Sequence, residues 1–208
     1  MDGGGYAMAY GLSTAAGIRP CLMLAISAWL MHDGTLHPAA AFAWLGQDGV
    51  CILLSLLAFV EFAGDKIPVL DHLLHLLHFG AKPIAAVLVA GGTVHFHDAR
   101  SMHEATEGAL MVASAANAVG LHFILATARG FTTTFTFGAV NPIVSVVEDI
   151  LCVVAIAAAI LVPIAAAVVA VMLTLVSVRF IRAFFRLVRE HRMRAAENAA
   201  GMEIGPLI

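Results

Sequence analysis

The stretch Glu61–His78, EFAGDKIPVLDHLLHLLH, determines how we interpret the rest of the chain. It closes a long apolar segment with three charged residues, turns at Ile67-Pro68, and continues as an amphipathic run that carries one aspartate and three histidines. Only 12% of the chain is charged, so this is a dense group of ionisable side chains beside a segment of bilayer length. Because ionisable groups are costly at membrane depth, those that occur there are candidates for function.

The composition of the 208-residue chain indicates an integral membrane protein. Hydrophobic residues make up 61% of it and the mean hydropathy is +0.94, which excludes an ordinary soluble domain. The apolar runs do not alternate, which favours helices over a β-barrel, since backbone groups in lipid must be paired within their own segment. We therefore expect an all-α fold, a polytopic transmembrane helical bundle. It would form one domain over residues 1–190, followed by a cytoplasmic C-terminal tail at 191–208.

Apolar runs long enough to cross a bilayer predict six spans. They are expected near residues 20–31, 49–62, 83–94, 107–127, 143–162 and 163–178. Pro20 starts a helix, and the piece before it is either a re-entrant half-helix or the other half of a kinked first helix. We also expect a break at residues 80–83, a loop at 95–107, and a division of the last apolar run at Pro163.

The basic residues set the predicted orientation. Six of the eleven lysines and arginines lie between residues 179 and 194, so the positive-inside rule places the C-terminus in the cytoplasm. With six crossings the N-terminus lies there too. Basic residues directly after an apolar helix suit a lipid surface better than nucleic acid, so we expect the lipid bilayer as partner and no nucleic acid. A homo-oligomer is left open.

The first candidate site lies in the opening stretch. Glu61 and Asp65 are four residues apart and share a helical face, where like charges repel unless a cation or proton lies between them. Lys66 is the candidate cation. An ion pair at headgroup level, with the lysine extended toward water, is equally compatible with the spacing. Asp71 follows in the first turn after Pro68, where the helix dipole favours a negative charge.

The second candidate site is the segment NPIVSVVED at residues 141–149. Asn141-Pro142 predicts a helix start, with asparagine as the cap and proline at the first helical position. Glu148 and Asp149 follow inside an apolar run and point about 100° apart on a helix. One is expected to face the protein interior and the other to meet Ser145 or a cavity. Two acids in such a run favour a functional role.

His72, His75 and His78 recur at every third residue of the opening stretch. A metal site usually takes histidines four residues apart or from different elements, so the spacing favours a polar stripe at the membrane interface over a metal site. The histidines and acids of residues 95–104 are interpreted as a solvated loop. No cofactor can be named from the sequence.

The two candidate segments also echo each other. DKIPVLDHLL at residues 65–74 and VNPIVSVVEDIL at 140–151 both place a polar residue before a proline and carboxylates a turn or two later. Weak internal symmetry of this kind is common in transporters. Six crossings would put both motifs on the same side, which fits parallel repeats better than inverted ones.

Three segments carry a resemblance to a known family: GIRP at residues 17–20, EFAGDKIPVLDH at 61–72 and NPIVSVVEDIL at 141–151. They resemble the signature of a bacterial integral-membrane family catalogued as domain-of-unknown-function family 4126. The resemblance extends from about Gly11 to Arg189 and implies a small polytopic helical protein of a bacterial inner membrane, with no assigned activity or substrate. The histidine-rich stretches depart from the family pattern.

The sequence thus favours a small inner-membrane transporter or channel-like protein for an ion or small solute. Its intramembrane site is expected to be lined by Glu61, Asp65, Lys66, Asp71, Asn141, Ser145, Glu148 and Asp149. The alternative is a non-catalytic membrane scaffold or accessory subunit, in which the buried charges pair internally and hold the helices in register. An enzyme is not expected, because the chain has no HExxH, GxSxG or comparable arrangement.

Overall fold

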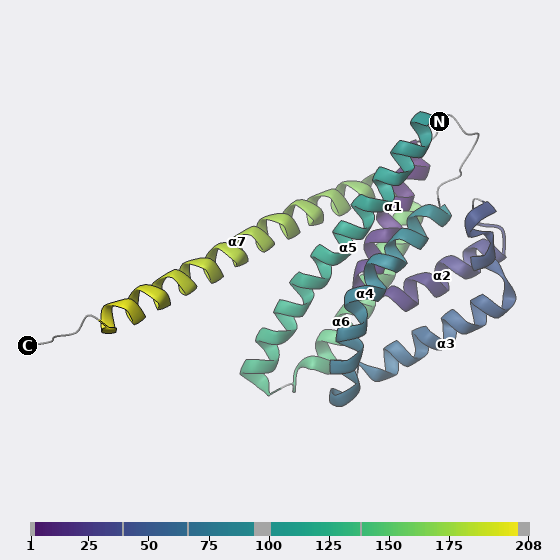
Figure 1. The fold of residues 1–208 in the computed structure, drawn as a ribbon. Helices are drawn as coiled ribbons and strands as arrows, with labels where there is room; N and C mark the ends of the chain where they lie inside the picture. The colour runs from purple at the N-terminus through teal and green to yellow at the C-terminus, as the bar shows by residue number, and fades with distance from the viewer. Residues whose placement is uncertain (1–2, 39, 66, 94–100, 138, 204–208) are drawn as a thin grey trace, which may run out of the picture.

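The computed structural model describes residues 3–38, 40–65, 67–93, 101–137 and 139–203. All regular structure in these ranges is helical, as the composition predicts. In chain order the elements are α1 (Gly3–Ile18), α2 (Pro20–His32), a short 3₁₀ helix η1 (Ala40–Gly46), α3 (Asp48–Gly64), α4 (Pro68–Thr93), α5 (Ser101–Thr136), α6 (Asn141–Leu161) and α7 (Pro163–Glu203) (Figure 1).

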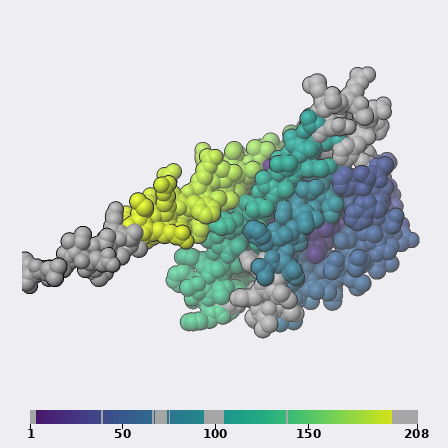
Figure 2. All heavy atoms as spheres, viewed as in Figure 1, coloured from purple at the N-terminus to yellow at the C-terminus, as the bar shows by residue number. Residues whose placement is uncertain are grey.

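Helix α1 is the centre of the bundle, and α4, α5, α6 and α7 all pack against it (Figure 1). Its small residues let neighbouring backbones approach closely, which is how helices pack in membranes. A Cβ atom added at Gly17 would lie 2.9 Å from the Cα of Ala118. Helices α2 and α3 pack on each other at one side, and α7 runs out of the bundle on the other (Figures 1 and 2).

Prolines set three of the helix starts. Pro20 is the first residue of α2, Pro68 of α4 and Pro163 of α7. A residue before proline is pushed out of the helical region, and Arg19 accordingly has an extended backbone (φ −128°, ψ 93°). The predicted helix starts at Pro20 and Pro163 are confirmed. The interruption at Arg19 separates α1 from α2, so the C-terminus of α1 lies next to the N-terminus of α2.

The described residues contain four helical segments long and apolar enough to cross a membrane: 76–93, 105–136, 141–161 and 163–194. A fifth is obtained if η1 and α3, bent by 65°, count as one broken span. Exposed leucines, valines and phenylalanines cover much of α3, α6 and α7, as lipid contact requires. The chain is therefore a helical membrane protein. The six spans are not reproduced, because α2 has only 13 residues, too few for a full crossing.

The predicted break at residues 80–83 is wrong. Helix α4 continues through Pro83, although the missing N–H and the ring clash of an internal proline cost about 3 kcal/mol. The residues that follow, Ala85, Ala86 and Val89, are completely buried, and α4 packs closely on α1 and α5. Tertiary packing therefore keeps the helix intact where local propensity would end it.

The polar segments on either side of the predicted fourth span are also more helical than expected. Helix α5 begins at Ser101, within the predicted loop at 95–107, and residues 94–100 lie outside the described ranges. It ends at Thr136, well beyond Arg129. Its last threonines bond to backbone carbonyl oxygens three or four residues earlier, as Thr134 does to Gly130 and Thr136 to Thr132, so their hydroxyl groups remain paired inside the helix.

Helix α6 starts one residue earlier than the asparagine cap predicts. Val140 is the N-cap residue, and Asn141 is the first helical residue, with Pro142 second. The side-chain oxygen of Asn141 accepts a hydrogen bond from Thr133 at 3.2 Å instead of capping the helix. The side chain of Asn141 therefore bonds to the C-terminal part of α5, and it is not available to cap α6 as the local pattern predicts.

Candidate functional site

The ionisable side chains of the bundle converge where α1 breaks into α2. Their helices of origin differ: Glu61 and Asp65 come from the end of α3, two basic residues from α4, one from α5 and two acids from α6. We call these residues the charged cluster. Its members are Arg19, Glu61, Asp65, His78, Lys82, Arg129, Ser145, Glu148 and Asp149.

Arg19 is the hub of the charged cluster and is 1% exposed. Its guanidinium forms an ion pair with Asp65, and its Nε lies 2.8 Å from Oδ1 of Asp149. The Nη2 group donates to both the hydroxyl (2.8 Å) and the carbonyl oxygen (3.0 Å) of Ser145. One side chain at the helix break therefore connects α3 to α6. Only an arginine offers a planar set of donors wide enough for this arrangement.

Arg129 makes the second connection. Its Nε and Nη2 donate in parallel to the two carboxylate oxygens of Glu148, the first at 3.0 Å, which is the strong bidentate form of such a pair. Its Nη2 also lies 3.7 Å from Asp65. Asp65 is consequently shared between the two arginines, and α5 is joined to both α3 and α6.

Glu61, which belongs to α3, caps the N-terminus of α2. Its Oε2 accepts hydrogen bonds from the backbone N–H groups of Cys21 (3.0 Å) and Leu22 (3.3 Å), in the first turn of α2. The N-cap residue, Arg19, provides no side-chain cap, so a carboxylate from α3 supplies it. The positive end of the helix dipole further favours the negative charge there. The other oxygen, Oε1, lies 3.0 Å from Nε2 of His78.

Lys82 completes the cluster: it is 3% exposed, and its charge interacts with Glu148 and Glu61. Within the described side chains, four carboxylates then face three cationic groups and one histidine.

The structure brings five of the eight predicted site residues into the cluster: Glu61, Asp65, Ser145, Glu148 and Asp149. Glu148 is buried in the interior and Asp149 lines a pocket, which agrees with the prediction that one acid faces the interior and the other meets Ser145 or a cavity. Asn141 instead contacts Thr133, one turn before Ser145. Lys66 lies outside the described residues, as does the side chain of Asp71.

Of the three histidines, the structure describes only the side chain of His78, which lies against Glu61. Among the described residues, no three histidine, cysteine or acidic side chains are grouped as a metal ion requires. The side chains of His72 and His75 are not among those described, so the metal site and the polar stripe both stay predictions.

Sequence reasoning missed Arg19, Arg129 and Lys82. The signal was present, because four acids buried in apolar helices require cations nearby, and the chain has few that are not in its C-terminal segment. Arg19 was visible inside the GIRP motif, but its partner Asp65 is 46 residues away along the chain. Lys66, the nearest cation in sequence, took its place in the prediction.

A pocket of about 340 Å³ adjoins the cluster between α2, α3 and α6. Its polar surface belongs to Arg19, Glu61 and Asp149, and its apolar wall includes Phe59, Phe62 and Val153. Asp149 is the most accessible acid of the cluster, with 18% of its side chain exposed, against 5% or less for the other three. The cluster is therefore closed on most sides and reachable from this one.

Comparison with known proteins adds one finding. The family model described as Domain of unknown function (DUF4126) matches residues 6–183. No curated protein and no solved structure matches the chain. The matched range includes all three segments that carried the resemblance, and every member of the charged cluster falls within it. Its description assigns no activity, so the function has to be argued from the cluster.

Proposed function

The chain belongs to the DUF4126 family, and we propose that it is a small membrane transporter for an ion or small solute. The charged cluster is the binding site in this proposal. The observation that carries it is the set of four carboxylates at the end of α3 and on α6, which lie with Arg19, Lys82 and Arg129 at a broken helix. Discontinuous helices whose ends meet ionisable groups are a recurrent feature of transporter binding sites.

The energetics support a role beyond structure. Burying an ion pair costs several kcal/mol per ion in desolvation, and a well-packed apolar pair of similar volume is often as stable or more stable. The cluster contains several such pairs in one place. A site that must bind and release a charged species needs groups of this kind, because the protein's own cations can replace the ligand when it leaves.

Proteoliposomes provide the test. The purified protein is reconstituted into vesicles, and flux is measured under an imposed potential with an internal pH-sensitive dye for H⁺ and with ion-selective dyes for Na⁺ and K⁺. We expect flux of at least one of these ions above that of protein-free vesicles, and a loss of about tenfold or more in Asp149→Asn. The matched control is Asp48→Asn, the same substitution at a side chain that is 83% exposed at the start of α3.

Asp149 is preferred over Glu148 for this test because its side chain is already partly exposed, so the variant is the more certain to fold. Equal flux in wild type and Asp149→Asn would overturn the proposal, and so would absence of flux both for these three ions and for the organic cation used as a probe below. Equal loss in Asp48→Asn would do the same, because it would show that the effect is not specific to the cluster.

The scaffold is the second candidate, favoured by the close internal pairing of Arg19 and Arg129. A charge swap separates the two functions. Arg129→Glu with Glu148→Arg keeps the pair but brings an acid to Asp65 and a cation to Lys82, so circular dichroism first has to show that the variant folds. In the folded variant a transporter loses flux because the field at the site is reversed, whereas a scaffold shows no flux in the wild type either.

We further propose the orientation and topology. The protein lies in a bacterial inner membrane with the C-terminus in the cytoplasm, since the arginines of residues 179–194 follow an apolar span. Both proline motifs begin helices, α4 and α6, which is compatible with an internal repeat. Six crossings would leave both termini on one side and five on opposite sides. Antibody access to tags at each terminus in intact and permeabilised spheroplasts decides between these counts.

A further inference from the structure

The pocket beside the charged cluster has the properties of a site for a ligand rather than of a packing defect. Its volume of about 340 Å³ lies within the range of small-molecule sites, about 300–1,000 Å³. Three charged side chains, Arg19, Glu61 and Asp149, line one side of it. The rest of the lining is apolar, which is the usual composition of a pocket that takes an organic molecule with one polar group.

The charge of this lining selects the sign of the ligand. Glu61 and Asp149 contribute two negative charges, and Arg19 contributes one positive charge that it already shares with Asp65. Among the residues that line the pocket, negative charge therefore exceeds positive charge, which favours a cation over an anion. The wall residues Phe59 and Phe62 strengthen this preference, because aromatic faces attract cations.

The contact between Asp149 and Arg19 uses a different part of the guanidinium from the other bonds of Arg19. Oδ1 of Asp149 lies 2.8 Å from Nε, while the Nη groups bond to Asp65 and Ser145. A ligand cation that takes over Asp149 leaves those bonds in place. The accessible acid and the buried arginine thus form an exchangeable pair at the inner end of the pocket.

The mouth of the pocket opens on an apolar surface. Phe59 is 67% exposed and Val153 is 54% exposed, and Val153 belongs to the membrane-spanning segment 141–161. A ligand that enters between these residues comes from the acyl-chain region and has to be soluble there. A hydrated inorganic ion does not satisfy this condition, because the hydrocarbon excludes it.

We propose that the pocket binds a hydrophobic organic cation, whose charge pairs with Asp149 and whose apolar body lies against the phenylalanines. This inference rests on the proposed transport function and names its substrate class. In the transport cycle, the cation competes with Arg19 for Asp149, and release restores the internal pair. His78 lies 3.0 Å from Glu61 and so adjoins the same site, since Glu61 also lines the pocket.

Binding to the purified full-length protein in phosphatidylcholine nanodiscs tests the inference. The probe is tetraphenylphosphonium, and its matched control is tetraphenylborate, which has the same shape and the opposite charge. We expect saturable binding of the cation alone, weakened about tenfold or more by Asp149→Asn. Equal binding of both probes, or a cation affinity that Asp149→Asn leaves unchanged, would overturn the inference.

A steric variant keeps the test decisive if Asp149→Asn fails to fold. Ala58 lines the pocket, and its neighbour Leu57 is 43% exposed and does not. Ala58→Trp should fill the pocket and abolish cation binding, while Leu57→Trp should leave it intact. The same loss in both variants, or in neither, contradicts the proposed location.

The outcomes separate this inference from the proposed function. Cation binding without flux of tetraphenylphosphonium or of any inorganic ion would support the pocket and overturn transport. Flux of H⁺, Na⁺ or K⁺ that depends on Asp149, with no cation binding, would support transport and overturn the substrate class. Absence of both would overturn both.

Discussion

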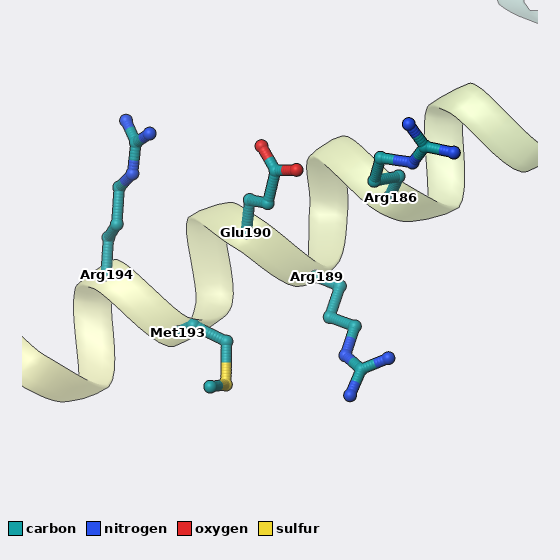
Figure 3. A pocket seen from close by; sticks show the side chains of 5 residues that line it. All are labelled: Arg186, Arg189, Glu190, Met193 and Arg194. Atoms are coloured by element: carbon teal, nitrogen blue, oxygen red, sulfur yellow. The ribbon is translucent and has the colours of Figure 1, made fainter.

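The charged cluster and the C-terminal half of α7 are both rich in arginine, and they differ in every other respect. In the cluster, Arg19 and Arg129 are buried and each contacts at least two acidic groups. On α7, the arginines of residues 179–194 are all exposed, on a helix that packs on α5 as far as Phe185 and then extends away from the bundle (Figure 1). Figure 3 shows Arg186, Glu190 and Arg194 on one side of that helix and Arg189 on the other.

The difference follows from the surroundings of each charge. Exposed pairs are screened and contribute at most about 1 kcal/mol, whereas a buried charge that loses its partner destabilises a protein by about 3–5 kcal/mol. The arginines of α7 are therefore replaceable one at a time, and they suit a surface of anionic lipid. The arginines of the charged cluster are not replaceable in this way, because each one is paired with buried carboxylates.

The largest expected effect comes from breaking a buried pair. Arg129→Met removes both bonds to Glu148 and leaves that carboxylate with only the more distant charge of Lys82, so we expect a loss of about 3 kcal/mol in the free energy of unfolding. The double variant Arg129→Met/Glu148→Met removes the charge as well and should recover most of the loss. Denaturant unfolding in detergent measures both. Equal destabilisation by the single and double variants would contradict the assignment.

A packing change inside the bundle comes second. Gly17→Ala puts a Cβ atom 2.9 Å from the Cα of Ala118, and overpacking of this kind costs about 1–3 kcal/mol. Gly80→Ala is the matched control, because a Cβ there meets nothing within 4 Å and helix propensity should raise stability by about 0.5–1 kcal/mol. The two changes should move the midpoint of unfolding in opposite directions. A shift in the same direction would count against close contact of α1 and α5.

A smaller effect is expected at the hydroxyl of Ser145. Ser145→Ala removes one of two acceptors from Nη2 of Arg19 and leaves the carbonyl oxygen in place, so we expect a loss of about 1 kcal/mol. Thermal unfolding followed by circular dichroism measures it. A loss as large as that of Arg129→Met would show that the hydroxyl of Ser145 does more than accept one hydrogen bond from Arg19.

The smallest effect on stability is expected on α7. Arg186→Gln should change the free energy of unfolding by less than about 0.5 kcal/mol, since the side chain is exposed and touches no buried group. Affinity for anionic vesicles should nonetheless fall by about 1 kcal/mol per arginine removed. Flotation with phosphatidylglycerol and phosphatidylcholine vesicles measures it. A large loss of stability in Arg186→Gln would contradict the difference that we infer between the exposed arginines of α7 and the buried arginines of the charged cluster.

Much of the fold follows from local patterns. The apolar runs predict helices, and the prolines at positions 20 and 163 predict where helices begin, because a missing N–H and a fixed φ act within one turn. The same rules fail at Pro83 and over residues 130–136, where packing on α1 and hydrogen bonds within α5 outweigh local preference. The acids were recognised because carboxylates in apolar runs are conspicuous without any structure.

Sequence alone therefore determines the membrane-embedded, helical character of the protein and indicates the four acids of the charged cluster. Only the tertiary structure assigns their partners. Arg19 meets Asp65 across 46 residues and Ser145 across 126, and nothing local indicates which cation lies opposite which acid. Hydrophobicity and backbone sterics act over a few residues, whereas electrostatic pairing depends on distance in space, which the packing of α1 against its neighbours establishes.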